Sequence, residues 1–295
     1  MPPGLSAPKV WRVIDADSSN AEQIRYWNEV GGPTWARLHA RTESQLAVFG
    51  RLAMERAKVT DSARVLDVGC GAGATTIALG GLVGPAGHVL GVDVSGPMLD
   101  VARQAAAGLA QVAFTQADAA SGGLPEGAFD LVFSRFGVMF FADPTAAFTQ
   151  LARALRPGGR LCFVCWRAAE HNPWMTVPLA AVAAHVPLAP LDPEAPGPLA
   201  FADAARVTRI LTGAGFLDVA LEPRDERTRL GGAATVDEAV DFLTQIGPAA
   251  RALRDAPAEA VALARAALRA SLSPYAGPDG VTLQGGVWIV TARVA

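Results

Sequence analysis

A run of nine residues, a predicted strand followed by a glycine-rich turn into a predicted helix, constrains this chain most. Val65 to Val68 form a short apolar run, Gly69-Cys70-Gly71-Ala72-Gly73 follows directly, and a helical pattern begins at about Ala74. Glycines are needed at such a point because the strand must turn sharply and because a ligand must lie against bare backbone. The start of the helix then offers unpaired N–H groups to an anionic part of that ligand. The run therefore predicts a ligand-binding strand–turn–helix unit.

The segment around this unit alternates short strands with helices. We expect strands at 65–68, 88–92, 112–115, 129–133 and 160–166, and helices from 74, at 97–107 and at 145–155. Such alternation is typical of parallel βαβ units with helices on both faces of one sheet. The fold class predicted from this pattern is α/β.

The flanking regions do not share this rhythm. Residues 1–18 are expected to be a loose lead, and residues 20–59 a helical cap interrupted by a flexible Gly31-Gly32-Pro33 turn, which suits a lid. After 166 we expect helices at 177–185 and 203–212, a strand at 217–221, a helical stretch at 225–285 and a last strand at 287–294. The predicted divisions are 1–60, 61–168 and 169–295.

Bulk composition excludes several classes of protein. Hydrophobic residues make up 51% of the chain and charged residues 18%, which argues against disorder. The net charge of -3 gives no basic footprint for nucleic acid. No apolar run reaches the roughly 18 residues of a membrane span, and the first ten residues lack a secretory pattern. Three cysteines indicate a reducing compartment rather than a disulfide framework, so we expect a cytoplasmic protein.

Three acidic residues discriminate between two candidate ligands of the glycine turn, a dinucleotide and S-adenosylmethionine. The turn alone also fits a dinucleotide site. Asp67, however, would set a second negative charge beside a pyrophosphate, whereas it would attract the amino and sulfonium groups of S-adenosylmethionine. Asp93 closes the second strand about twenty residues on, where an acid can accept the ribose hydroxyls. Asp118 follows the third strand and could accept the adenine amino group. S-adenosylmethionine is therefore favoured over NAD.

These motifs resemble those of class I S-adenosylmethionine-dependent methyltransferases, in particular the type-11-like branch that contains the quinone-biosynthesis methyltransferases. The matching pieces are 67–73, Asp93, 118–119, 129–132 and the turn at 155–159. The resemblance implies a Rossmann-like, doubly wound sheet of seven strands whose last strand, here 287–294, is antiparallel. It also implies that Ser134 and Arg135 lie beside the methionine end of the cofactor. The predicted cofactor residues are Asp67, Gly69, Cys70, Gly71, Gly73, Asp93, Val94, Met98, Asp118, Ala119, Ser134 and Arg135.

The methyl acceptor should meet the carboxyl edge of the sheet. The predicted acceptor-binding residues are Trp27, Trp35, Phe136, Met139, Phe140 and Trp174. Met139 and Phe140 stand where the quinone C-methyltransferases usually have a basic residue and an amide, so the acceptor atom stays open. Candidate catalytic residues are His39, His171 and Arg135. No metal site is expected, because Cys162 and Cys165 lie three apart on one strand and must point to opposite faces.

The sequence predicts an enzyme that transfers the methyl group to an O, N or C nucleophile of a small, fairly hydrophobic molecule, with oxygen favoured. The product of the cofactor would be S-adenosylhomocysteine. Two alternatives stay open: an NAD(P)-dependent oxidoreductase with a Rossmann fold, and a non-catalytic S-adenosylmethionine-binding protein. The expected partner is a small-molecule acceptor and neither nucleic acid nor a membrane, and a homodimer is possible.

Overall fold

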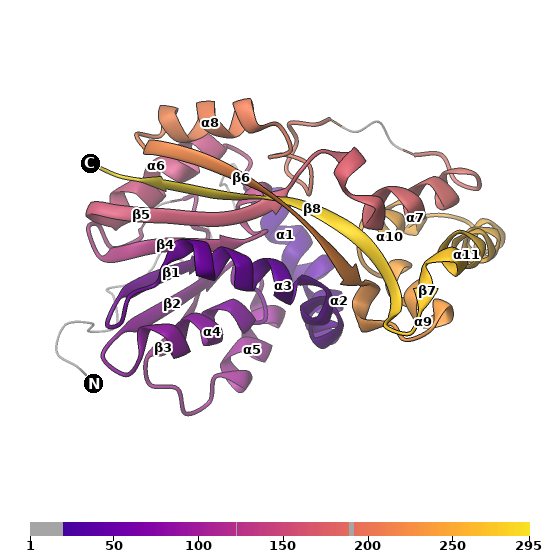
Figure 1. The fold of residues 1–295 in the computed structure, drawn as a ribbon, viewed down its shortest axis with the longest axis horizontal. Coiled ribbons are helices and arrows are strands. Elements are labelled where there is room, and N and C mark those ends of the chain that lie inside the picture. The colour runs from indigo at the N-terminus through magenta and orange to yellow at the C-terminus, as the bar shows by residue number, and fades with distance from the viewer. Residues whose placement is uncertain (1–19, 122, 189–191) are drawn as a thin grey trace.

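A single twisted sheet organises the molecule (Figure 1). The computed structural model describes residues 20–121, 123–188 and 192–295. The strands of the main path lie in the order β3-β2-β1-β4-β5-β8-β6, and β8 runs antiparallel to both β5 and β6. The predicted seven-stranded α/β sheet with a reversed last strand is therefore confirmed. The residues 1–18 that we expected to be a loose lead fall outside the described residues.

Five parallel strands form the core of the sheet: β1 (Arg64–Val68), β2 (His88–Asp93), β3 (Val112–Gln116), β4 (Phe129–Arg135) and β5 (Leu155–Trp166). Helices α4 (Ala74–Val83), α5 (Gly96–Ala105) and α6 (Pro144–Ala154) connect them. Ser95 and Asp143 cap α5 and α6 by accepting the N–H groups of Met98 and Ala146, and a proline follows within two residues of each cap. Helices cover both faces of the sheet, which explains the nearly continuous apolar strands.

The N-terminal cap consists of three helices: α1 (Ala21–Glu29), α2 (Gly31–Arg37) and α3 (His39–Ala57). The expected flexible turn at Gly31-Gly32-Pro33 is wrong, because these residues begin α2 and the break falls at Val30. Gly32 is buried, and a side chain there would collide with the carbonyl of Trp27 and the hydroxyl of Ser95. The glycine therefore serves close packing, and the proline occupies a helix start where its missing N–H costs nothing.

The last two sheet strands are longer than predicted. β6 (Leu217–Arg229) and β8 (Gly280–Arg293) pair from Leu217↔Arg293 to Arg229↔Thr282. The helical stretch expected at 225–285 is therefore confined to 230–275. It contains η3 (Leu230–Gly232), α9 (Val236–Leu243), α10 (Pro248–Leu253), α11 (Ala258–Leu272) and η4 (Ser273–Tyr275), and a two-residue strand β7 (Ala276–Gly277) leads back into β8. We call residues 230–275 the insertion.

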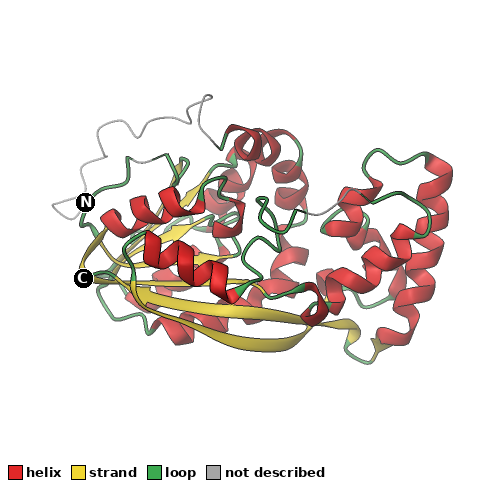
Figure 2. Cartoon of the chain, turned by 90° about the horizontal axis from the view of Figure 1, so that it is seen from above, coloured by secondary structure: helices red, strands yellow, loops and turns green. Residues whose placement is uncertain are grey.

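The β6–β8 ribbon carries the insertion away from the core sheet (Figures 1 and 2). Helix α7 (Pro173–Ala183) packs against α10 and α11 at that end, and α8 (Ala204–Gly213) packs on β6 and α6. The remaining short helices are η1 (Val138–Phe140) and η2 (Ala169–His171). Within the described parts of the chain, no helix combines the length and the hydrophobicity needed to cross a membrane.

Candidate active site

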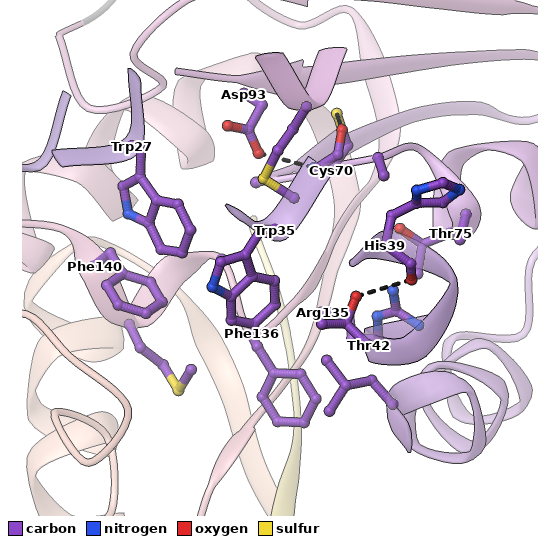
Figure 3. Close-up of a pocket in the computed structure, with 18 of the residues that line it drawn as sticks. Trp27, Trp35, His39, Thr42, Cys70, Thr75, Asp93, Arg135, Phe136 and Phe140 are labelled. Atoms are coloured by element: carbon purple, nitrogen blue, oxygen red, sulfur yellow. Dashed lines mark hydrogen bonds between the residues drawn. The ribbon is translucent and has the colours of Figure 1, made fainter. Parts of the chain in front are cut away.

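A cavity of about 570 Å³ opens at the carboxyl ends of the parallel strands, where ligands bind in open α/β sheets. Its walls come from the glycine turn after β1, the ends of β2 to β5, the cap and the insertion, and helices α4, α5 and α7 add further residues. Figure 3 shows Asp93 at one edge of this space, Trp27 and Phe140 at another, and His39, Thr42 and Arg135 grouped together. Residues far apart in the chain therefore converge on one site.

The glycine turn has the backbone conformation that the sequence required. Gly69, Gly71 and Gly73 all have positive φ, at 66°, 54° and 84°. Gly71 lines the cavity, and a Cβ on it would come within 2.7 Å of Met98 Cε. Gly73 does not line the cavity. A Cβ there would meet Ala102 of α5 and Phe114 of β3 at 2.8 and 2.9 Å, so this glycine lets the turn pack closely against those two elements instead of touching a ligand.

Cys70 lines the cavity as a small, buried residue within the turn. Its Sγ lies 2.9 Å from the position of a Cβ built on Gly91, so the glycine at position 91 makes room for this thiol. Burial raises the pKa of its thiol well above the usual value, and the nearby Asp93 and Asp67 add to that shift. The thiol is therefore neutral and unreactive, as expected of a packing residue.

Asp93 ends β2 with both carboxylate oxygens facing backbone donors. Its Oδ2 accepts the N–H of Gly71 at 2.8 Å, and its Oδ1 accepts the N–H of Ser95 at 2.8 Å. The side chain is half-buried and lines the cavity. Each carboxylate oxygen keeps a second lone pair, so the group can accept the two ribose hydroxyls without losing these bonds. Burial raises its pKa, and the backbone bonds oppose that shift.

Asp118 lies at the cavity wall with one oxygen unused. Its Oδ1 accepts the N–H of Ala120 at 3.0 Å and the amide of Asn20 at 3.3 Å. Its Oδ2 is buried and has no partner in the described part of the chain. A buried acceptor without a donor is costly, and the adenine amino group would supply the donor. Val94, Met98 and Ala119, which were also predicted as cofactor residues, line the same cavity.

Asp67 lies behind the glycine turn rather than in the cavity wall, contrary to the expectation of direct cofactor contact. The hydroxyls of Thr75 and Thr76 both donate to its Oδ2 at 2.7 Å. Its Oδ1 is buried and has no partner among the described residues. Burial raises the pKa of this carboxyl to about 6, and the two hydroxyl bonds and the charge of Arg135 limit the shift. The negative charge therefore acts on the cavity through the turn and the start of α4.

The segment after β4 touches the glycine turn directly. A Cβ on Gly137 would lie 2.7 Å from Gly69 Cα and 2.7 Å from the carbonyl of Val68. Phe136 has a φ of 62°, an uncommon conformation for a bulky residue and one that aims its ring into the cavity. Ser134 is fully buried, and its hydroxyl accepts the N–H of Gly137, so it shapes this segment. Contrary to the prediction of a cofactor residue, Ser134 does not line the cavity.

Arg135, the last residue of β4, forms an ion pair that the sequence did not reveal. Its two terminal nitrogens donate to the two oxygens of Glu43 at 2.9 and 2.6 Å. The side chain of Arg135 is 13% exposed and that of Glu43 is 34% exposed, and both line the cavity. The pair joins α3 of the cap to the carboxyl edge of the sheet.

Aromatic rings form most of the other half of the cavity. All six predicted acceptor residues line it. Trp27 makes edge contacts with Trp35 and Phe140, at centroid distances of 5.7 and 5.3 Å. Phe136 stacks on Trp166 at 4.2 Å with 15° between the ring planes. Such a surface accommodates a planar, apolar molecule.

Only one of the two candidate histidines lines the cavity. His39 lines the cavity and holds its Nδ1 2.8 Å from the carbonyl of Ala36. Because a carbonyl only accepts, this bond places the proton on Nδ1 and leaves Nε2 free to take one. His171 does not line the cavity. Its ring contacts Arg167 at 3.0 Å, beside the Arg167–Asp225 ion pair, so the structure removes it from the candidate bases.

Cys162 and Cys165 point to opposite faces of β5, as predicted. The thiol of Cys162 donates to the carbonyl of Ala53 on α3, and that of Cys165 to the carbonyl of Phe201 on the other face. Both are buried, and burial raises the pKa of Cys162 to about 12. They are core residues.

Several site residues escaped the sequence-based prediction. They are Asn20, Glu43, Thr75, Thr76 and Phe242. For Thr75 and Thr76 a signal existed, since two hydroxyls directly follow the glycine turn that Asp67 precedes. For Glu43 and Phe242 none existed, because their partners are distant in the chain.

The cofactor half of the cavity fits S-adenosylmethionine on three independent observations. Asp93 can accept the ribose hydroxyls, Asp118 has an unused buried oxygen near the adenine position, and Gly71 leaves a space that a Cβ would fill. Asp67 and Thr75 lie where a cationic amino group would be stabilised. A pyrophosphate would instead lie near the negative charges of Asp67, behind the turn, and of Asp93, in the cavity wall, which disfavours a dinucleotide.

Comparisons with known proteins agree with this geometry. Residues 65–159 match the family described as a methyltransferase domain. The chain is 32% identical over 149 residues to the aklanonic acid methyltransferase DauC of Streptomyces sp. strain C5, over 50% of this chain and 66% of that protein. It is 39% identical over 99 residues to the nocamycin O-methyltransferase of Saccharothrix syringae, over 33% of this chain and 35% of that protein.

A third relative is the demethylmenaquinone methyltransferase of Staphylococcus aureus, 34% identical over 126 residues, or 43% of this chain and 52% of that protein. The chain thus spans from about a third to about two thirds of the length of these relatives. Among solved structures, the YcgJ protein of Bacillus subtilis is similar in fold, with a TM-score of 0.53 and 21% identity over 84% of this chain and 98% of that one.

Phosphoethanolamine N-methyltransferase 2 of Haemonchus contortus, solved with S-adenosylhomocysteine, shares the fold with a TM-score of 0.52 and 17% identity, over 95% of this chain and 58% of that one. The sequence matches, the strand order and the cofactor half of the cavity agree with one another. Residues 65–159 of this chain therefore form a methyltransferase domain, similar in sequence and strand order to the class I S-adenosylmethionine-dependent methyltransferases.

Proposed function

We propose that this protein transfers the methyl group of S-adenosylmethionine to a small, hydrophobic, ring-containing molecule, with a hydroxyl oxygen as the favoured acceptor atom. One observation carries the proposal: the cofactor half and the aromatic half belong to a single cavity. A cofactor held by Asp93 and Asp118 would therefore share that space with any acceptor lying against Phe136 and Phe140. The names of two relatives, both methyltransferases that act on small molecules, support the same class of substrate.

When bound, the cofactor supplies a methyl group already activated by the positive sulfur. The chain itself must hold donor and acceptor in line and exclude water. The contact between Gly69 and Gly137 brings the acceptor wall close to the cofactor wall, and the cap and the insertion cover the cavity. Positioning is thus the main contribution that we propose for the protein.

His39 is the side chain that we propose as general base. Its Nε2 can take the proton of a hydroxyl as the new O–C bond forms and the S–C bond breaks, which leaves a methyl ether, S-adenosylhomocysteine and protonated His39. Replacing His39 with Gln should lower turnover of a hydroxyl acceptor and leave cofactor affinity unchanged. A full rate with His39→Gln would show that no base is taken from this position.

A thermal-shift comparison tests the cofactor, because a ligand stabilises the folded state that it binds. S-adenosylmethionine and S-adenosylhomocysteine should raise the melting temperature, and NAD and NADP should not. Turnover is then measured as S-adenosylhomocysteine released with a panel of phenols and other aromatic hydroxyl compounds. Stabilisation by NAD alone would favour the oxidoreductase alternative. Cofactor binding without turnover, in a panel that covers hydroxyl, amine and carbon acceptors, would favour a non-catalytic binding protein.

A further inference from the structure

The two formal charges on the acceptor side of the cavity neutralise each other. Arg135 and Glu43 meet through two short hydrogen bonds of 2.9 and 2.6 Å, a bidentate arrangement that occupies both carboxylate oxygens. Arg135 is anchored at the end of β4 and packs over Gly50 of α3, while Glu43 comes from α3 itself. The pair is therefore held from two elements and contributes no net charge to the cavity.

Two neighbouring polar side chains also have hydrogen-bond partners within the protein. The hydroxyl of Thr42 donates to the carbonyl of His39 at 2.9 Å, and Gln45 Oε1 accepts the N–H of Gly231 at 3.0 Å. The rest of this wall is mostly aromatic, and Figure 3 shows Trp35, Phe136 and Phe140 around the same space. Within the described residues, this half of the cavity thus has an apolar surface with no unmatched charge.

A charged acceptor would find no counter-ion here unless the ion pair opened. A carboxylate beside Arg135 would also lie beside the Glu43 carboxylate, so it could gain the full attraction of Arg135 only by displacing Glu43. An ammonium group could likewise gain the full attraction of Glu43 only by displacing Arg135. In either case one protein charge is left unpaired in a partly buried, apolar place, which is strongly unfavourable. An uncharged aromatic molecule meets neither cost and gains contact with the ring faces.

We infer that the Glu43–Arg135 pair is a specificity determinant: it makes the cavity select an uncharged aromatic acceptor and reject carboxylates and amines that are ionised at neutral pH. This inference rests on the proposed methyl transfer and narrows its acceptor to a neutral hydroxyl compound. The cavity selects a neutral acceptor because its two charges are paired with each other, not because it lacks charged residues. Removing one charge of the pair should therefore change which acceptor charge is preferred, and the direction depends on whether Glu43 or Arg135 is replaced.

Binding of three matched probes tests the inference without knowledge of the natural acceptor. The probes are 2-naphthol, 2-naphthoate and 2-naphthylmethylammonium, which share one ring system and differ in charge. Calorimetry on protein saturated with S-adenosylhomocysteine near neutral pH should show 2-naphthol binding at least about tenfold more tightly than either ion. Failure of S-adenosylhomocysteine to bind would contradict the proposed function, whereas its binding together with equal affinity for all three probes would overturn only this inference.

Two variants then give opposite predictions. Glu43→Gln leaves the Arg135 charge unmatched and should raise the affinity for 2-naphthoate about tenfold over wild type. Arg135→Gln leaves Glu43 unmatched and should raise the affinity for 2-naphthylmethylammonium instead. Glu55→Gln, the same change at an exposed position of α3 outside the cavity, is the matched control and should leave all three affinities unchanged. Unaltered probe preferences in both cavity variants, each shown to bind S-adenosylhomocysteine, would overturn the inference.

Discussion

Asp67 holds a buried carboxyl group whose energetic cost depends on pH. Burial raises its pKa from 3.8 to about 6, so the folded state binds a proton more tightly than the unfolded state does. As pH rises from about 4 to about 6, the unfolded chain loses this proton first, and the free energy of unfolding falls. The cost is complete above the folded-state pKa and corresponds to about 3 kcal/mol.

Asp67→Asn removes this titration. We expect the unfolding free energy of the wild type, relative to that of the variant, to fall between about pH 4 and pH 6 and to level off above. Asp93 and Asp118 also have raised pKa values, but they titrate in both proteins and cancel in the difference. Urea denaturation of the two proteins across this range measures the effect. Parallel pH curves would show that Asp67 is not the group responsible.

At the same scale, the sequence predicts residues whose role follows from local position. Asp93 and Asp118 each follow a recognisable strand, so their place at the edge of the sheet could be inferred. Glu43 pairs with a residue 92 positions away, and nothing near it in the sequence indicates a partner. His171 also follows a strand, β5, so its sequence position predicted a place at the cavity, but its ring contacts Arg167 instead. Only three-dimensional packing decides such cases.

Two elements of the fold, the glycine turn after β1 and the segment after β4, pass each other at Gly69 and Gly137. Gly137→Ala would place a Cβ 2.7 Å from two backbone groups, so one of the two segments must move. We expect at least about a tenfold loss of affinity for S-adenosylhomocysteine by calorimetry, because effects of about 1.4 kcal/mol or more are usual when packed backbone shifts.

Gly213→Ala is the matched control for this change. Its Cβ would lie 3.6 Å from Thr145, an ordinary contact, at the end of α8 and away from the cavity. This variant should keep its affinity for S-adenosylhomocysteine, and its free energy of unfolding should rise by about 0.4–1 kcal/mol. If Gly137→Ala behaved like Gly213→Ala, the turn and the segment after β4 would not depend on close contact.

Elements of the parallel core could be predicted, and those of the outer ribbon could not. β1 and β4 are buried on both faces and read as apolar runs. Most of β6 is exposed, and its second half, Pro223 to Arg229, consists almost entirely of polar and charged residues, so pairing with β8 rather than burial makes it a strand. In β8, Gly285 and Gly286 interrupt the apolar pattern, so the sequence predicted only the second half of this strand, from residue 287.

Across the whole molecule, the cap and the insertion meet over the cavity. Arg41 of α3 donates to the carbonyls of Gly231 and Glu238 at 2.9 and 2.7 Å, and its guanidinium lies 5.1 Å from the ring centre of Phe242. Phe242 lines the cavity, so Arg41 links the two segments at a point that shapes the acceptor space. Tyr26 and Arg254 make a second contact of this kind, with the guanidinium 5.4 Å from the ring centre.

Arg41→Met should loosen this junction while the core sheet stays intact. We expect faster amide hydrogen exchange in residues 230–243 by mass spectrometry, and unchanged exchange in β1 and β2. Arg51→Met, at an exposed position of the same helix, is the control and should leave exchange in the insertion as in the wild type. Equal exchange in both variants would mean that the insertion is held in place without Arg41.

The position of β8 between β5 and β6 has a consequence for the order in which the chain folds during synthesis. The five parallel strands are complete once Trp166 has been made, but among the described strands β6 pairs only with β8, whose residues 280–293 follow later. The insertion is therefore made while its two supporting strands are still apart. Closure of the aromatic half of the cavity must then be a late event, so a ribosome-bound chain should gain its nucleoside-binding edge well before its acceptor chamber.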